Sequence, residues 1–317
     1  MVVPVISVED QGDVRHVQVL RKSTGNFPNQ FTTSWPADLL SALAELKGEW
    51  FSDSYARFEV PYYIQRQVDI VLAIYGLELT GKRILDFGCG FGASSYCLMR
   101  RGADRIVATD LEPANTALAR RIFERLNLAG RVEIRQENLV PRLQSEEFDM
   151  IWLQAVLEHL LPQERREYLP AFWKALRPGG YLIITETPNR AWPHESHTTG
   201  GRYWLNWRSR HSAFARLRRE SAYHDWSDEQ FYRSGVIGAT YSEILDCLQK
   251  PPDCDEVALQ VKAYLPTVYR HSRIRSGKRE LAVRAVAFAE PFVRRVLRRP
   301  VTAFLPYLQH LAFRKHG

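Results

Sequence analysis

Apolar and polar positions follow a regular order between residues 82 and 188, and this order predicts a sheet covered by helices. Short apolar runs predict buried strands at 83–87, 105–110, 131–136, 148–154 and 181–187. Apolar residues at helical spacing predict helices at 94–103, 115–130 and 162–180. Strands that alternate with helices over short connections form a parallel sheet with right-handed crossovers and helices on both faces. The predicted fold class is therefore α/β, with a doubly wound and mostly parallel sheet.

The region before this core is predicted to be helical. Residues 37–50 and 55–79 have apolar residues at helical spacing, while residues 1–34 show turn signals and no clear element. We expect residues 1–79 to form a helical cap that covers the substrate, and residues 80–317 to form the main domain.

The region after Pro188 loses this regularity. A helix is predicted at 240–249 and a strand at 256–264. The ending 306–316 alternates between apolar and polar residues, so it predicts a last strand. Because so little chain follows the preceding helical segment, this strand is expected to enter the sheet antiparallel to its neighbours.

The composition is that of an ordinary globular protein, with 45% hydrophobic and 25% charged residues. No apolar run reaches the roughly 18 residues of a membrane span, and the first residues lack the basic-then-apolar order of a secretory signal. We therefore expect a cytoplasmic protein. The four cysteines show no CxxC or metal-knuckle spacing, so reduced, packed thiols are expected and no metal site is predicted.

The net charge of +7 comes from the C-terminal part of the chain, because twelve Lys and Arg stand against two Glu from Val268 onward. Residues 268–300 combine apolar positions at helical spacing with arginines, which predicts a basic helical insertion before the last strand. This insertion either packs on the sheet or makes peripheral contact with anionic lipid or a phosphate-bearing substrate. Residues 208–220 form a second basic, helix-like segment. Nucleic acid is not an expected partner, since the sequence has no aromatic stacking motif of a known RNA-binding module.

A glycine-rich turn joins the first predicted strand to the first helix, in the stretch Asp86-Phe87-Gly88-Cys89-Gly90-Phe91-Gly92. Glycines at such a turn allow a ligand to lie against the main chain. They also satisfy the pattern of dinucleotide binders, so the glycines alone do not decide which kind of ligand binds. Asp110 ends the second strand, where a carboxylate accepts both hydroxyls of a ribose. Asp86 favours a cationic ligand over a pyrophosphate, because its negative charge lies near the turn.

In these motifs the chain resembles the class I S-adenosylmethionine (SAM)-dependent methyltransferases, particularly the large branch of small-molecule enzymes often called type 11. The resemblance covers roughly residues 80 to 190 and rests on "LDFGCGFG", "VATDLEP", "FDMIWLQAVLEHL" and "ALRPGGYLIITETPNR". It implies a Rossmann-like fold whose last strand is reversed, SAM as the cofactor and S-adenosylhomocysteine as the product.

The resemblance also implies which residues contact the cofactor. Asp86 lies near the amino group of the methionyl part, the three glycines line the methionyl and ribose parts, and Asp110 holds the ribose. The family commonly has an acid over the adenine. Its position corresponds to either Glu137 or Asn138 in this sequence, and both alternatives stay open. Gln154 stands where family members often touch the methionyl end. The full predicted set is Asp86, Gly88, Gly90, Gly92, Asp110, Leu111, Glu137, Asn138, Leu139 and Gln154.

Methyl transfer to a hydroxyl also needs a base, for which histidine or a carboxylate is the usual choice. The segment 188–235 holds His194, Glu195 and His197 among aromatic residues, at the edge of the sheet where substrates bind. We interpret it as a substrate loop, with His197 as the predicted base and His194 in reserve. The same HxxH spacing with Glu195 is an alternative set of metal ligands, although imidazole suits magnesium poorly.

The pair Glu158-His159 follows the fourth strand of the sheet and is common in the family irrespective of substrate. We expect it to make a hydrogen bond at the start of the next helix that supports the site, with His159 as a third catalytic candidate.

The acceptor class is suggested by a second resemblance. The stretch "TPNR-WP-E-HTTG" is similar to family members associated with polysaccharide, sugar and lipid-linked substrates, which favours hydroxyl methylation. Methylation of a base nitrogen is disfavoured, because residues 154–157 lack an Asn/Asp-Pro-Pro-aromatic turn. Two alternatives stay open: a NAD-type oxidoreductase with the same glycine turn, and a non-catalytic protein that binds SAM or nucleic acid.

Overall fold

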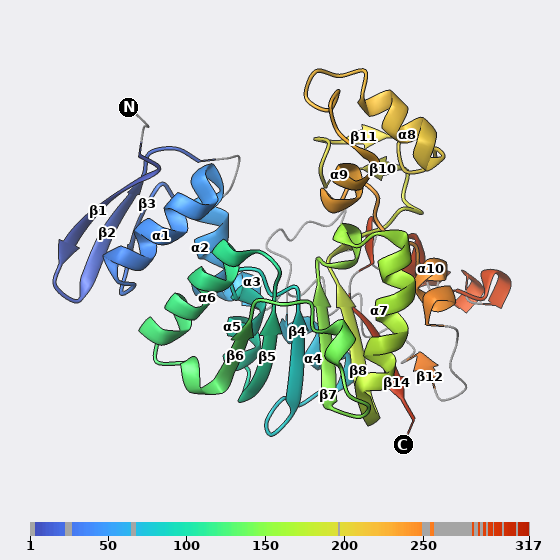
Figure 1. Cartoon of the computed structure of the whole chain (residues 1–317), viewed down its shortest axis with the longest axis horizontal. Coiled ribbons are helices and arrows are strands. Elements are labelled where there is room, and N and C mark those ends of the chain that lie inside the picture. Colours follow the sequence, from blue (N-terminus) through green and yellow to red (C-terminus); the bar gives the residue numbers. More distant parts are fainter. Residues whose placement is uncertain are drawn as a thin grey trace.

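A seven-stranded sheet forms the centre of the molecule, in the order β12-β14-β8-β7-β4-β5-β6 (Figure 1). The computed structural model describes residues 4–22, 27–64, 68–195, 197–248, 254–256, 281, 285, 288–289, 291–293, 295–299, 301–308 and 310–316. The strands of the sheet are β4 (Arg83–Phe87), β5 (Arg105–Thr109), β6 (Val132–Arg135), β7 (Phe148–Gln154), β8 (Leu176–Thr185), β12 (Cys254–Glu256) and β14 (Leu311–Lys315). Strands β4 to β8 are parallel, whereas β14 runs antiparallel to both β8 and β12. The predicted α/β fold with a reversed last strand is confirmed.

Alternate residues of the central strands point to opposite faces of the sheet, and each face has its own apolar core. Ile84 packs in the core under α5 (Ala93–Met99) and α6 (Pro113–Arg125). Leu85 packs in the other core, against α7 (Pro162–Ala175) and α10 (Tyr241–Cys247). The sequence predicts all four helices, but the prediction of helix over 176–180 is wrong, because these residues begin β8. The connections contain the 3-10 helices η3 (Ala129–Arg131), η4 (Val140–Arg142) and η5 (Leu157–His159).

The N-terminal region begins with an antiparallel sheet, not with a helix. It is formed by β1 (Ile6–Gln11), β2 (Val14–Val19) and β3 (Gln30–Thr33). The helical elements that follow are α1 (Ala37–Lys47), η1 (Gly48–Trp50), α2 (Phe51–Glu59), α3 (Pro61–Ile64) and α4 (Ile70–Tyr75). The prediction of a helical cap over 1–79 is therefore wrong for residues 6–33. The sequence does not reveal these strands because their alternation is short: only Ile6 and Val8 of β1 are partly buried, and only Val17 and Val19 of β2 are buried.

Residues 189–237 fold into a lobe that rises above the central sheet (Figure 1). The lobe contains β10 (His194–Glu195), β11 (Arg202–Tyr203), α8 (Arg210–Leu217) and α9 (Asp228–Arg233). Its apolar core consists of Leu205, Ala213, Phe214, Leu217, Phe231, Val236 and Ile237. The segment expected to be a loop is thus a packed structure, and the helix-like segment 208–220 contains α8. Just before the lobe, β9 (Thr187–Pro188) pairs antiparallel with β13 (Tyr307–Leu308).

The predicted basic insertion, 268–300, lies outside the described residues except for 281, 285, 288–289, 291–293 and 295–299. The strand predicted at 256–264 also lies outside them beyond Glu256. The chain then forms η6 (Val301–Phe304) before β13. In the part of the chain that the structure describes, no helix has the length and apolar character needed to cross a membrane.

Candidate active site

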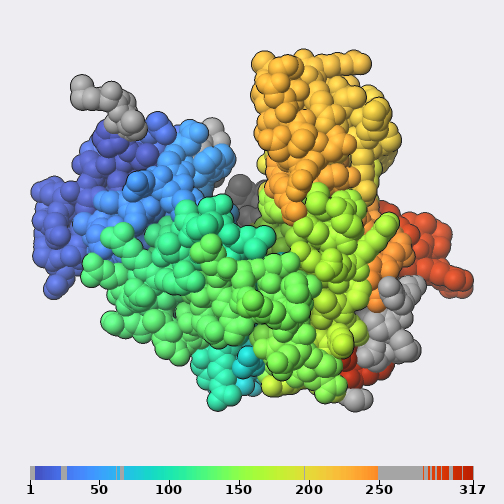
Figure 2. Space-filling model, in the orientation of Figure 1, coloured from blue at the N-terminus to red at the C-terminus, as the bar shows by residue number. Residues whose placement is uncertain are grey.

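A cavity of about 730 Å³ lies at the carboxyl edge of strands β4 to β7. Ligand pockets are typically about 300–1,000 Å³, so the volume suits a nucleoside-sized molecule. Figure 2 shows the molecule hollowed between the N-terminal region, in blue, and the lobe, in yellow and orange. Of the residues predicted from the sequence, the cavity is lined by Gly88, Asp110, Leu111, Glu137, Asn138 and His159.

The glycine turn has the backbone that only glycine adopts easily. Gly88, Gly90 and Gly92 have φ of 74°, 54° and 90°. A Cβ on Gly88 would lie 2.8 Å from Val156, and one on Gly92 would lie 2.8 Å from the ring of Phe123. A Cβ on Gly90 would meet no described atom within 4 Å. Packing therefore explains two of the glycines, and only at Gly90 does the missing side chain leave space.

Asp110 is held at the tip of β5 in an orientation that suits a ribose. The backbone N–H of Gly90 donates to Oδ2 at 2.9 Å, and the N–H of Glu112 donates to Oδ1 at 2.9 Å. Oδ1 also accepts a longer hydrogen bond from Nδ2 of Asn115 at 3.5 Å, so Oδ2 is the oxygen that keeps capacity for a ligand hydroxyl. These contacts fit the adenosyl ribose of SAM.

Asp86 lies beneath the turn and is 1% exposed. Its Oδ2 accepts the hydroxyls of Ser94 and Ser95 at 2.6 and 2.5 Å. Burial raises the pKa of Asp86 to about 6, although the two serine hydroxyls oppose this shift. Asp86 is not among the residues that line the cavity, so its expected contact with the methionyl amino group stays a prediction.

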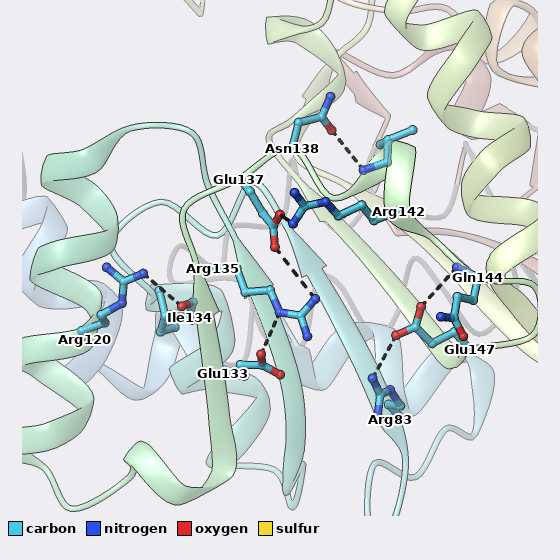
Figure 3. A network of polar contacts seen from close by, with 11 residues as sticks. Arg83, Arg120, Glu133, Ile134, Arg135, Glu137, Asn138, Arg142, Gln144 and Glu147 are labelled. Carbon is cyan, nitrogen blue, oxygen red and sulfur yellow. Dashed lines mark hydrogen bonds and ion pairs between the residues drawn. The ribbon is translucent and has the colours of Figure 1, made fainter.

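The end of β6 is already occupied by internal contacts. Figure 3 shows Glu137 between Arg135 and Arg142, with an oxygen 2.7 Å from the guanidinium of Arg142. Asn138 donates to the hydroxyl of Tyr168 at 2.8 Å and accepts from the backbone. Both line the cavity, whereas Leu139 is 3% exposed and packs in the core. The structure leaves open which of Glu137 and Asn138 faces an adenine.

The ends of β7 and β8 carry strained backbone. Ala155 and Glu186 follow these strands with φ of 53° and 59°, in the left-handed region that non-glycine residues seldom adopt. Such residues concentrate at functional sites. Gln154 donates to Glu186 at 3.1 Å, and this links the two strand ends beside the cavity. The expected contact of Gln154 with the cofactor stays a prediction.

Helix α1 reaches the rim of the cavity from the N-terminal region. Nζ of Lys47 donates to Oδ1 of Asn115 at 3.2 Å and lies 4.3 Å from the centre of the Phe91 ring. Asn115 lines the cavity. Burial lowers the pKa of Lys47. The N-terminal region thus contacts the cavity rim through Lys47, and its expected role of covering the substrate stays a prediction.

The opposite side of the cavity is formed by η5 and the lobe. Nδ1 of His159 donates to the carbonyl oxygen of Arg233 at 2.7 Å, and Arg233 donates back to the carbonyl of His159 at 3.1 Å. The rings of His159 and His197 lie 6.0 Å apart. Glu158, beside them, is 0% exposed. Burial raises the pKa of Glu158 to about 8 and lowers that of His159.

The expected role of Glu158-His159 at a helix start is wrong. Helix α7 is capped by Glu164, whose carboxylate accepts the backbone N–H of Leu161 at 2.8 Å. Instead, His159 of this pair forms a hydrogen bond with Arg233 of the lobe, which lies 74 residues later in the chain. Sequence alone holds one signal of this, a Glu-His pair inside the apolar run "AVLEHLL", and none that links Arg233 to the site.

The structure separates the three residues of the HxxH stretch. The ring of His194 packs on Tyr203 at 4.4 Å and does not line the cavity. Glu195 is 3% exposed, and its carboxylate accepts the backbone N–H of His197 at 2.7 Å and that of Thr199 at 2.9 Å. Glu195 therefore holds the backbone of this segment, while His197 alone of the three approaches His159.

A comparison with known families agrees with this geometry. Residues 85–184 match the family model described as a methyltransferase domain. Over residues 85–184 the chain therefore has a methyltransferase domain, and the resemblance of its motifs to the class I SAM-dependent methyltransferases is confirmed. The cofactor of this class is SAM and the product is S-adenosylhomocysteine, as expected.

The relatives of this chain match over part of their length. It is 27% identical over 150 residues to carboxy-S-adenosyl-L-methionine synthase of Erwinia tasmaniensis, covering 44% of this chain and 61% of that protein. It is 28% identical over 113 residues to ribosomal protein L11 methyltransferase of Syntrophomonas wolfei, covering 36% and 35%. A solved SAM-dependent methyltransferase of Methanosarcina mazei is 27% identical with a TM-score of 0.32, covering 36% of this chain and 55% of that one. The chain thus spans less than two thirds of the length of each.

Proposed function

We propose that this protein is a SAM-dependent methyltransferase that methylates a hydroxyl of a small-molecule, sugar or lipid-linked acceptor. The observation that carries the proposal is one cavity whose lining includes Gly88 and Asp110 at one side and His159 at the other. A donor held by Asp110 and an acceptor beside His159 share this space. Group transfer needs such proximity above all.

Each side of the cavity has a separate task in this reaction. SAM supplies a methyl group, whose bond to sulfur breaks as the bond to the acceptor oxygen forms, leaving S-adenosylhomocysteine, the methyl ether and a proton. Asp110 accepts the ribose hydroxyls, and the N–H of Gly90 keeps that carboxylate oriented. The lobe and α1 flank the cavity and limit the access of water. The hydroxyl proton leaves at the side where Glu158, His159 and His197 gather.

A hydroxyl acceptor is supported by the groups on the acceptor side. Imidazole and carboxylate groups assist the loss of a proton, which a hydroxyl needs for methyl transfer. The names of two relatives indicate other activities: one is a synthase of carboxy-SAM, and the other methylates a ribosomal protein. The assignment of His197 as the base, with His194 in reserve, stays a prediction.

The first test is binding of the cofactor, followed by a search for the acceptor. Titration calorimetry should give heat with SAM and with S-adenosylhomocysteine, and none with NAD. Methyl-labelled SAM should then transfer its label to a hydroxylated sugar, lipid-linked or small-molecule acceptor. A protein that binds NAD but neither SAM nor its product contradicts the proposal. Transfer to a protein side chain would retain the enzyme class and reject the acceptor.

Contact with an anionic membrane also stays a prediction. Its support is a set of exposed apolar side chains with exposed arginines nearby in the chain, a combination that settles on anionic lipid. They are Leu281, Phe288, Phe292, Val296 and Leu297, with Arg295, Arg298 and Arg299. Sedimentation should recover the protein with phosphatidylserine vesicles more than with phosphatidylcholine vesicles, and Phe288→Glu with Phe292→Glu should reduce that fraction. Equal recovery with both lipids contradicts the prediction.

A further inference from the structure

Glu158 is a fully buried carboxylate with unused capacity for a ligand. It is 0% exposed, and neither of its oxygens has a partner at full hydrogen-bond geometry within the described part of the chain. The hydroxyl of Thr187 and the guanidinium of Arg165 lie near enough to lower its pKa, but they do not offset its burial. A buried carboxylate that loses its hydration without compensation is costly, so such groups are normally paired, hydrogen-bonded, bound to a metal or protonated. Burial raises the pKa of Glu158, so without a cation nearby it carries a proton, which a metal ion would displace on binding. The contacts of the neighbouring histidines indicate which of these applies.

His159 presents a free ring nitrogen to this carboxylate. Since a carbonyl oxygen only accepts, the hydrogen bond to Arg233 places the ring proton on Nδ1 and the lone pair on Nε2. Nε2 lies 4.0 Å from Oε1 of Glu158. A ring N–H held by a backbone carbonyl is the arrangement that orients metal-binding histidines.

His197 completes the cluster from the lobe. Glu158, His159 and His197 each offer one ligand atom, and the three atoms lie within 4.8 Å of one another. The backbone N–H of His197 is held by Glu195 at 2.7 Å. Gly235 approaches so closely that a Cβ there would lie 2.9 Å from Cδ2 of His197 and 3.2 Å from Cγ of Glu158. The α9 end of the lobe thus packs against both the carboxylate and the imidazole.

We propose that Glu158, His159 and His197 bind a divalent transition-metal ion, such as Mn²⁺, Co²⁺ or Zn²⁺, at the acceptor side of the cavity. Two imidazoles and one carboxylate suit these ions and leave coordination positions open, whereas Mg²⁺ prefers oxygen ligands. Metal bonds of about 2.0–2.2 Å separate ligand atoms by about 3 Å, so the side chains close in by about 1–2 Å on binding. His197 is the exposed member of the cluster, so its side chain is the one that moves most easily toward the other two ligands.

This site differs from both metal expectations drawn from the sequence. No metal site was predicted there, and the alternative grouped His197 with His194 and Glu195, which the structure places elsewhere. The inference deepens the proposed function and rests on it for the role of the ion. An open coordination position beside the cavity takes the acceptor oxygen and lowers the pKa of its hydroxyl. His197 is then a metal ligand and not the base.

Binding of Co²⁺ to the chelator-stripped full-length protein tests the site without any turnover. Co²⁺ held by imidazole nitrogens absorbs visible light, so a titration should show saturation at about one ion per chain, and Zn²⁺ should displace it. Glu158→Gln and His197→Gln should each weaken binding by about 10-fold or more. His194→Gln is the matched control, because it removes a histidine from the same segment but outside the cluster, and it should bind as the wild type does.

Three outcomes overturn the inference: no saturable binding by the wild type, unchanged binding in His197→Gln, or weakening by His194→Gln alone. If the buried Glu158→Gln variant fails to fold, the exposed His197→Gln variant still decides. SAM binding is measured on the same samples. SAM binding without Co²⁺ binding rejects the metal site alone, and Co²⁺ binding without SAM binding rejects the proposed function alone.

Discussion

The two sides of the cavity are built in different ways. On the cofactor side, Gly90 and Asp110 are 20 residues apart and joined directly at 2.9 Å, each at the end of a neighbouring strand. On the acceptor side, His159 is held by Arg233, 74 residues later, through the lobe. Short-range contacts leave a motif in the sequence, whereas the acceptor side depends on how a separately packed lobe meets η5. The chemistry of the first side is therefore readable from sequence, and that of the second needs the fold.

The largest effect is expected on the acceptor side. His159→Gln should reduce methyl transfer by about 100-fold or more, because the proposed function places this side chain beside the reacting oxygen. SAM affinity should stay unchanged, since the cofactor contacts lie on the other side. Steady-state assays with labelled SAM and the acceptor found by screening measure the rate of methyl transfer. Calorimetry measures the affinity for SAM.

The control for this variant is His211→Gln, an exposed histidine on α8 of the lobe. It should retain the wild-type rate. If His159→Gln instead weakens SAM binding by the same factor as it lowers the rate, His159 also contributes to cofactor binding. The division of the cavity into a cofactor side and an acceptor side would then be wrong.

The second effect is expected on the cofactor side. Asp110→Ala should weaken SAM binding by about 10- to 100-fold, because a charge-assisted hydrogen bond contributes about 1.5–3 kcal/mol. Asp104→Ala is the matched control, because Asp104 is an exposed aspartate directly before the first residue of β5, whereas Asp110 follows its last residue. Calorimetric titration compares the two. Equal affinities would show that Asp110 only orients the turn through its contacts to Gly90 and Glu112.

The part of the fold that the sequence predicts is the part with strong periodicity. Strands β4 to β8 alternate between two buried faces, so their apolar runs mark them clearly. Strand β1 has only partly buried and exposed residues, and β10 and β11 have two residues each. None of these three strands is long or buried enough to give a clear apolar alternation. For the site, Gly88 and Asp110 followed from motifs, but the contact of Glu158 with the lobe did not. It requires Gly235 to approach a residue 77 positions earlier, which no local pattern encodes.

The third effect concerns stability and separates the roles of two glycines. Gly92→Ala should lower the free energy of unfolding by about 3 kcal/mol, because it combines a left-handed backbone with a close contact to Phe123. Gly90→Ala should cost about 1 kcal/mol, since only the backbone strain applies. Urea denaturation gives both values. A larger loss in Gly90→Ala would show that packing is not what distinguishes the two positions.

The smallest effect is a pH dependence that comes from Asp86, on the cofactor side. Asp86 has a pKa of about 6 in the folded protein, raised by burial. An unfolded aspartate titrates near about 3.9, so the folded state binds the extra proton between these two values. Its contribution to stability is present below the unfolded pKa and is lost as the pH rises through the folded pKa. The free energy of unfolding of the wild type should therefore fall between pH 5 and pH 7, relative to Asp86→Asn, by about 1 kcal/mol.

The Asp86→Asn variant keeps an oxygen that accepts the hydroxyls of Ser94 and Ser95. The pH dependence of its free energy of unfolding therefore contains the contributions of all titrating groups except Asp86. Urea denaturation of both proteins at pH 5, 6 and 7 gives the difference. Parallel profiles would mean that Asp86 is ionised throughout this range and that its charge is compensated beneath the turn. A difference that grows toward pH 7 would instead place an uncompensated negative charge under the glycines, where a cationic methyl donor relieves it on binding. The cofactor side would then contribute affinity through charge as well as through the ribose contacts of Asp110.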